Sequence, residues 1–181
     1  MEAQRKMTGL PSFAIVVMGV SGCGKSTLAA HLAAHLAVPA FEGDDFHAPG
    51  SVAKMRAGQP LDDDDRWPWL DRLGAAIGGA VREQGIAVAA CSALKRSYRE
   101  RLEAAAGVPI AFVLLEGDRD EIAPRLAARA GHYMAPSLLD SQFATLERPG
   151  ADERAITLHC YRPVEELCGE VLAWAEVVRV I

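Results

Sequence analysis

The sequence has no uninterrupted apolar run of about 18 residues, the length that a membrane-spanning helix requires. Its first residues also lack the apolar segment of a secretory signal. Both absences argue against export and against a membrane partner. We therefore expect a cytoplasmic protein in which residues 1–12 form a short disordered leader.

Cysteine is scarce, and an excess of basic charge is missing. The four cysteines among 181 residues show neither C-x-x-C nor any zinc-binding spacing, so we expect reduced thiols rather than a disulfide framework. Lysine and arginine number 19 against 24 acidic residues, with no basic tail, which argues against nucleic acid as a partner. Internal repeats and low-complexity linkers are also lacking. The length then fits one domain spanning residues 1–181.

What the sequence does contain is the segment 19–26, GVSGCGKS, a complete match to the phosphate-loop pattern G-x-x-x-x-G-K-[ST]. An apolar segment precedes it and helix-forming residues follow, so the loop should join a strand to a helix N-terminus. In such loops backbone N–H groups face the phosphates, Lys25 reaches the β- and γ-phosphates and Ser26 binds Mg²⁺. We expect ATP and Mg²⁺ as cofactors. The expected nucleotide-binding residues are Gly19, Ser21, Gly22, Cys23, Gly24, Lys25, Ser26 and Thr27.

Apolar segments alternate with segments of helical periodicity along the rest of the chain. The expected strands are 13–18, 38–42, 86–91, 110–115 and 155–159. The expected helices are 27–36, a short piece at 51–56, 67–83 with Pro68 in its first turn, one after Lys95 ending near 106, 119–130, 136–146 and 163–177. This alternation predicts a parallel five-stranded sheet with helices on both faces, a three-layer α/β/α fold with right-handed crossovers.

Asp44 and Asp45 follow the second expected strand, at the sheet edge where α/β proteins gather their ligands. A carboxylate there can accept the proton of an acceptor hydroxyl during phosphoryl transfer. No acid follows the strand that ends at Cys91, where many nucleotide hydrolases place a magnesium-binding aspartate. We choose Asp44 as the catalytic base, although spacing alone does not separate it from Asp45 and a turn aspartate is the structural alternative.

Arg125 and Arg129 stand four residues apart on an expected helix, and His132 follows just beyond it. Guanidinium groups on a mobile segment can close over a transferring phosphoryl group and neutralise its charge. The alternative is a solvated basic face at a helix C-terminus, which the helix dipole favours. Because a phosphate loop is present, we favour the interpretation in which the arginines neutralise a transferring phosphoryl group. Our expected catalytic set is therefore Lys25, Asp44, Arg125 and Arg129.

Two other clusters are expected to be structural. The four consecutive carboxylates from Asp62 to Asp65 are open to interpretation as a cation site, but adjacent carboxylates repel one another and we expect a solvated loop. Trp67 and Trp69 are expected to serve packing rather than ligand stacking.

The motifs together carry a family resemblance. In chain order they are residues 19–26, Gly43-Asp44 with His47, Lys54-Met55 with Gly58 and Pro60-Leu61, Asp63 and Asp65-Arg66 with Pro68-Trp69-Leu70, residues 91–95 (CSALK) with Tyr98-Arg99, Arg125-Leu126 with Arg129, Gly131-His132, and Gln142-Phe143 with Leu146-Glu147. This set closely resembles the gluconokinases, small ATP-dependent kinases of the nucleoside monophosphate kinase-like type that phosphorylate the 6-hydroxyl of D-gluconate. The resemblance runs from about residue 13 to residue 160. D-x-D-R-x-P-W-L and C-S-A-L-K are its most specific parts.

The resemblance implies a mobile lid at about residues 125–138, an acceptor-binding region at about 47–85 and a homodimer. It implies that the phosphate loop holds ATP and that Asp44 faces the sugar hydroxyl. The implied acceptor-binding residues are Asp44, His47, Lys54, Arg66, Lys95, Arg99 and His132. A sugar acid calls for a guanidinium or ammonium clamp on its carboxylate, but the resemblance does not rank the four cations among these residues.

The sequence departs from the family at two positions beside the expected acceptor site. The family commonly has His-Pro followed two residues later by Asn, whereas this chain has Ala48 after His47, and Ser51 where the Asn stands. Acceptor choice is therefore the open point. A kinase for another small acceptor, such as shikimate or a nucleotide, and an ATP-binding sensor without acceptor chemistry remain as alternatives.

Overall fold

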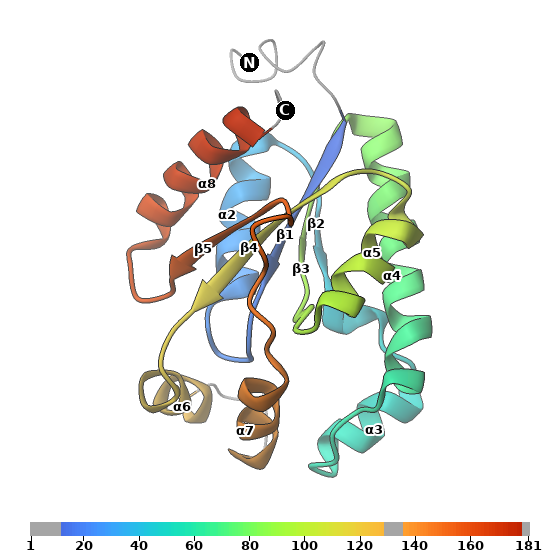
Figure 1. The fold of residues 1–181 in the computed structure, drawn as a ribbon, viewed down its shortest axis with the longest axis vertical. Coiled ribbons are helices and arrows are strands. Elements are labelled where there is room, and N and C mark those ends of the chain that lie inside the picture. The colour runs from blue at the N-terminus through green and yellow to red at the C-terminus, as the bar shows by residue number, and fades with distance from the viewer. Residues whose placement is uncertain (1–11, 129–135, 179–181) are drawn as a thin grey trace.

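The computed structural model describes residues 12–128 and 136–178, and a five-stranded parallel sheet forms its centre (Figure 1). The strands are β1 (Phe13–Met18), β2 (Ala40–Glu42), β3 (Ile86–Ala90), β4 (Ile110–Glu116) and β5 (Ala155–His159). They lie in the order β2-β3-β1-β4-β5, every neighbouring pair being parallel. The expectation of a parallel five-stranded sheet is confirmed.

Helices cover both faces of the sheet, as expected for a three-layer fold. The helices are α2 (Lys25–Leu36), α3 (Pro49–Arg56), α4 (Asp63–Gln84), α5 (Arg96–Ala106), α6 (Arg119–Ala127), α7 (Pro136–Thr145) and α8 (Val164–Val178), with a 3₁₀ turn, η1, at Gly43–Phe46. In Figure 1, α2 and α8 lie on one side of the sheet, and α4 and α5 lie on the other. Helices α3, α6 and α7 gather beyond the carboxyl ends of the strands. Within the described ranges, no helix is both long and apolar enough to cross a membrane.

The two layers of helices explain why β1 is apolar at every position. All six of its residues are buried. Ile15 and Val17 pack in the core beside α2 and α8, whereas Val16 and Met18 pack with α4 and α5. A strand buried on both faces needs apolar side chains on both, so its sequence is continuous rather than alternating. The four free cysteines are buried in the same interior, at Cys23, Cys91, Cys160 and Cys168.

Helix α4 begins four residues earlier than predicted. Asp62 caps it through a reciprocal pair of hydrogen bonds with Asp65, so the acidic run forms the cap and first turn of the helix rather than a loop. Pro68 therefore lies in the second turn and not in the first. The apolar periodicity begins only at Trp67 and so does not mark the start of the helix, which polar capping residues determine. The prediction of a solvated loop at 62–65 was wrong.

Strand β2 is shorter than predicted, since Val38 and Pro39 lie outside it. Proline has no N–H to donate to the neighbouring strand, which is consistent with pairing that starts at Ala40.

Candidate active site

The phosphate loop has the geometry that its sequence predicts. It follows β1, and all three of its glycines have positive φ, of 137° at Gly19, 86° at Gly22 and 98° at Gly24. These angles favour glycine because a side chain would be strained there. Lys25 starts α2, and its Nζ donates a hydrogen bond to the Val20 carbonyl at 2.9 Å. The ammonium group therefore lies against the loop, where phosphates of a nucleotide bind.

Glu42, at the end of β2, contacts the phosphate loop, and the sequence analysis missed it. The Ser26 hydroxyl donates to Glu42 Oε2 at 2.5 Å. A hydroxyl and a carboxylate oxygen are hard oxygen donors, the type that Mg²⁺ prefers. The signal was available, because Glu42 is the last residue of a strand whose carboxyl end faces the site. Its contact across 16 positions is what the sequence did not reveal.

Asp44 lies two residues beyond Glu42, in η1, with its side chain 64 % exposed. Two contacts with α4 hold this turn: Trp69 Nε1 donates to the Gly43 carbonyl at 2.6 Å, and the Arg72 guanidinium donates twice to the Phe46 carbonyl. Gly43 packs so closely on β3 that a Cβ would lie 2.5 Å from the Ala90 carbonyl oxygen. The turn is thus fixed at both ends while the Asp44 carboxylate stays open to solvent.

His47 supports Asp44 from the interior. Its ring stacks on Trp69 with centroids 4.1 Å apart, and only 4 % of its side chain is exposed. Its Nε2 is 3.9 Å from Asp44 Oδ1, whereas the buried Nδ1 has no hydrogen-bond partner among the described residues. Burial lowers the pKa of His47 below 6.5, and the nearby Asp44 carboxylate opposes that shift only in part.

A pocket of about 530 Å³ lies next to the first turn of α4. It is lined by Leu61, Asp62, Asp63, Asp64, Arg66, Lys95, Ser141 and Thr145. Asp63 lies among the cations of this pocket: Lys95 Nζ is 3.0 Å from its carboxylate, Arg66 Nη1 is 4.0 Å away, and the Tyr98 hydroxyl donates to it. The Tyr98 hydrogen bond, followed by that of Lys95, lowers the pKa of Asp63. The structure therefore brings two of the four candidate cations, Arg66 and Lys95, into one pocket.

The other two candidate cations have different surroundings. Lys54 donates to both carboxylate oxygens of Asp65, at 2.9 and 2.7 Å, and does not line the pocket. Arg99 is 1 % exposed; its guanidinium binds Glu153 through two hydrogen bonds and donates to the carbonyls of Ala93, Leu94 and Glu147. All three nitrogens of this guanidinium thus already donate to acceptors within the protein. In this structure Arg99 therefore forms a buried ion pair and binds backbone carbonyls, contacts that favour a structural role.

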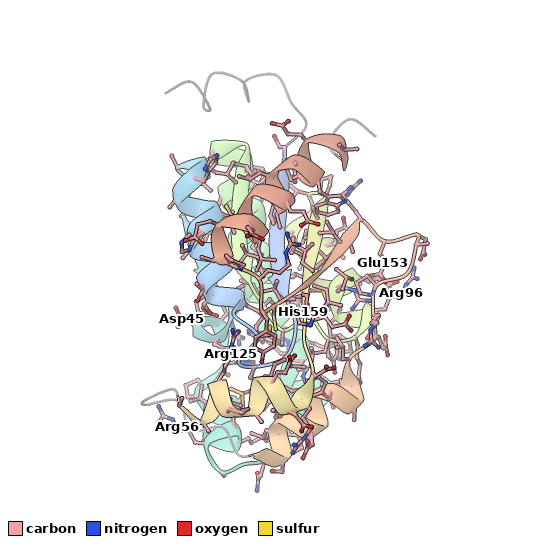
Figure 2. All side chains as sticks on the ribbon, turned by 90° about the vertical axis from the view of Figure 1, so that its left-hand side faces the viewer. Asp45, Arg56, Arg96, Arg125, Glu153 and His159 are labelled. Carbon is pink, nitrogen blue, oxygen red and sulfur yellow. The ribbon has the colours of Figure 1, made fainter. Side chains whose placement is uncertain are left out.

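Arg125 lies on α6, and in Figure 2 its side chain lies between this helix and the sheet. Its guanidinium stacks on the Tyr161 ring at 4.0 Å and donates to the Cys160 carbonyl at 3.4 Å. Arg129 and His132 lie outside the described residues, as does half of the expected lid, at 129–135. Of the lid, only the segments at its two ends, in α6 and α7, are described.

Comparisons with known proteins show which proteins the chain resembles in sequence and in fold. A family described as an AAA domain matches residues 15–149. Gluconokinase from Gluconobacter oxydans is 49 % identical over 86 % of each chain, and thermoresistant gluconokinase from Escherichia coli is 41 % identical over 91 % of this chain and 92 % of its own. The crystal structure of a gluconokinase from Sinorhizobium meliloti superposes with a TM-score of 0.80 at 42 % identity, covering 94 % of this chain and 95 % of that one.

Proposed function

Because the chain belongs to the gluconokinase family, we propose that it transfers the γ-phosphoryl group of ATP to D-gluconate, giving 6-phospho-D-gluconate and ADP. One observation carries the proposal: the phosphate loop follows the carboxyl end of β1, and Lys95, a cation of the pocket, follows the carboxyl end of the neighbouring strand β3. A kinase needs this combination, because the nucleotide and the acceptor must meet at the γ-phosphate.

The pocket matches the chemistry of a sugar acid. Arg66 and Lys95 provide positive charge for its carboxylate, and the oxygens of Asp63, Ser141 and Thr145 can hydrogen-bond its hydroxyls. Asp63 holds both cations in the structure, so an incoming carboxylate would share or replace that contact. Of the four cations that the sequence left unranked, we propose Arg66 and Lys95 as the clamp, while Lys54 pairs with Asp65.

The proposed catalytic roles belong to residues of the phosphate loop and to residues at the carboxyl end of β2 or just after it. Lys25 and the loop N–H groups bind the phosphates of ATP, and Asp44 accepts the proton of the acceptor hydroxyl. Ser26 and Glu42 would hold Mg²⁺, which supplies charge neutralisation at the transferred phosphate. Arg125, together with Arg129 and His132, would close over the nucleotide as part of a lid at about 125–138. His47 keeps the Asp44 turn packed on Trp69.

The chain as a whole is proposed to be one kinase domain in which about 47–85 forms the acceptor-binding region. A homodimer and a cytoplasmic location are part of the same proposal, on the basis of the family. Light scattering of the purified protein tests the dimer, which would have twice the 19.3 kDa of the chain.

The test is ADP formation with Mg-ATP and a panel of acceptors: D-gluconate, shikimate, AMP and none. We expect stimulation by gluconate alone, with one 6-phospho-D-gluconate formed for each ADP. Stimulation by another acceptor would contradict the proposed substrate. ATP binding without stimulation by any acceptor would instead support a sensor. The pocket cations provide a second check, since Lys95→Met should raise the KM for gluconate more than the KM for ATP.

A further inference from the structure

Helix α7 connects the acceptor pocket with the phosphate loop. Ser141 and Thr145, one helical turn apart, line the pocket. Between them, Gln142 accepts a hydrogen bond from the Ser21 backbone N–H through its Oε1, at 2.7 Å. Ser21 belongs to the loop that binds the nucleotide, and it lies 121 positions away in the sequence. The same short helix therefore contacts the two places that must be aligned for phosphoryl transfer.

The position of α7 is itself fixed. Leu139, near its middle, is 1 % exposed and packs in the core. Just beyond its last turn, the Glu147 N–H donates to the Leu94 carbonyl at 2.8 Å, and Arg99 donates to the Glu147 carbonyl at 3.1 Å. Leu94 precedes Lys95, the pocket cation. Gln142 thus extends from a helix that is anchored to the acceptor side.

The amide of Gln142 suits a role beside phosphates. It has one oxygen acceptor and an Nε2 group with two N–H donors. With the oxygen bonded to Ser21, the uncharged side chain adds no negative charge next to the phosphate loop. Groups that align reactants need such rigid support, since a misplacement of about 1 Å can cost about 100-fold in rate.

We propose that Gln142 is a positioning residue that sets the phosphate loop relative to the acceptor wall, so that the γ-phosphate faces the acceptor rather than water. The inference rests on the proposed function. Losing the Gln142 contact uncouples the two sites: ATP still binds, but its phosphoryl group reaches the acceptor less often. The competing explanation is that Gln142 accepts the hydrogen bond of the Ser21 N–H in the absence of nucleotide, and that a bound nucleotide replaces it without any role for Gln142 in alignment.

Three variants separate these explanations. Gln142→Leu removes the hydrogen bond, and Gln142→Glu keeps an oxygen acceptor for Ser21 but adds a charge. Gln84→Leu is the matched control, because Gln84 is an exposed helical glutamine at the end of α4, two residues before the amino end of β3, whereas the site lies at the carboxyl ends of the strands. For each variant the measurements are kcat, the KM for ATP and for gluconate, the ratio of ADP to 6-phospho-D-gluconate, and the melting temperature.

We expect Gln142→Leu to lower kcat by about 10- to 100-fold, to raise the ratio of ADP to product clearly above one and to change the KM for ATP little. Gln142→Glu should restore that ratio towards one while raising the KM for ATP through charge repulsion. Gln84→Leu should match the wild type.

Two results would overturn the role of Gln142. One is tighter ATP binding by Gln142→Leu with unchanged kcat and an unchanged ratio of ADP to 6-phospho-D-gluconate. This result would mean that the Gln142 side chain is simply displaced when the nucleotide binds. The other is a loss of melting temperature with kcat and ratio unchanged in both Gln142 variants. The wild type keeps the two proposals apart, because gluconate-dependent turnover with no effect in the variants contradicts the role of Gln142 alone. A wild type without such turnover contradicts the proposed function itself.

Discussion

At the scale of single residues, the ion pair between Arg99 and Glu153 joins α5 to the segment that leads into β5. Arg99 is 1 % exposed and the Glu153 side chain 12 %. Figure 2 shows Glu153 close to Arg96, which forms a separate ion pair with Asp152 at 2.7 Å. The Arg99 guanidinium also bonds the carbonyls of Ala93 and Leu94, and Ala93 has a positive φ of 43°. This pair therefore holds a strained turn in place just before Lys95.

Replacing Arg99 by Met should be strongly destabilising. Glu153 would keep its charge with little solvent, and buried pairs that lose one partner typically cost about 3–5 kcal/mol. Arg101→Met is the control, since Arg101 pairs with Asp71 at the surface and such pairs contribute roughly 0–1 kcal/mol. Urea unfolding measures both. Equal losses in the two variants would argue against a special role for the buried pair.

The assignment of the base to Asp44 rather than Asp45 also belongs to this scale. Asp44→Asn should keep ATP affinity but lower kcat by about 10²- to 10⁴-fold, the usual contribution of a general base. Asp45→Asn is the neighbouring control, and its turnover should stay close to the wild type. Turnover with gluconate and ATP titration of both variants measure this. Normal turnover of Asp44→Asn would disprove the assignment.

Residue types were readable from the sequence, but their partners were not. The phosphate loop and the pocket cations Arg66 and Lys95 follow from motifs. Arg99 has the same type and a similar position, yet it forms a buried ion pair with Glu153, which lies 54 positions away in the sequence. Glu42 was not singled out, and Gln142 was named only as part of a family motif without a role, because their contacts with the phosphate loop cross 16 and 121 positions.

At the scale of elements, α4 and α5 pack at close range through glycines on α4. A Cβ added at Gly78 would overlap the carbonyl oxygen of Ala106, whereas one added at the next residue, Gly79, would meet nothing within 4 Å. The two adjacent glycines therefore differ in whether helix packing requires the absence of a side chain. Gly78 permits the close approach, and Gly79 does not contribute to it.

Substituting alanine at each glycine should change stability in opposite directions. Gly79→Ala should stabilise by about 0.5–1 kcal/mol, because alanine loses less backbone entropy in a helix. Gly78→Ala should destabilise by roughly 1–3 kcal/mol, the usual cost of overpacking. Unfolding in urea compares the two directly. A stabilised Gly78→Ala would mean that α5 shifts at little cost.

Elements were predictable where apolar spacing governs them. All five strands were found because buried parallel strands are continuous apolar runs. The start of α4 was not found, since Asp62 and Asp65 cap the helix before any apolar residue appears. The order of the strands in the sheet was not predicted either, because it depends on contacts between segments far apart in the chain.

At the scale of the whole molecule, acid should weaken the fold in two separate steps. The first involves His47, whose pKa is lowered by burial and by Arg66 and Arg72, with Asp44 acting in the opposite direction. Because the unfolded chain binds this proton more readily, stability falls as the pH drops below about 6.5, the usual value of histidine. The second step occurs at a lower pH, near the usual pKa range of carboxylates and below. The pKa values of Asp63, Asp65 and Glu153 are lowered by their hydrogen-bonded partners, and protonation of these carboxylates breaks their ion pairs.

His47→Gln should remove the first step and leave the second. The measurement is the free energy of unfolding in urea between pH 5 and 7.5 for both proteins. The wild type should lose stability across this range as the pH falls, and the variant should lose less. An identical slope in the two proteins would show that His47 does not control the first step.

Because all four thiols are buried, their chemical labelling can report local unfolding of the segments that cover them. Burial raises the pKa of Cys91 to about 12 and that of Cys160 to about 11, so neither thiol is a reactive thiolate at neutral pH in the closed state. Cys23 lies in the phosphate loop, Cys91 follows β3, Cys160 follows β5 and Cys168 is on α8. An alkylating reagent reaches each one only when its own segment opens. The four labelling rates, read by mass spectrometry, would therefore give the local opening free energy at four points, and nucleotide should slow the labelling of Cys23 most.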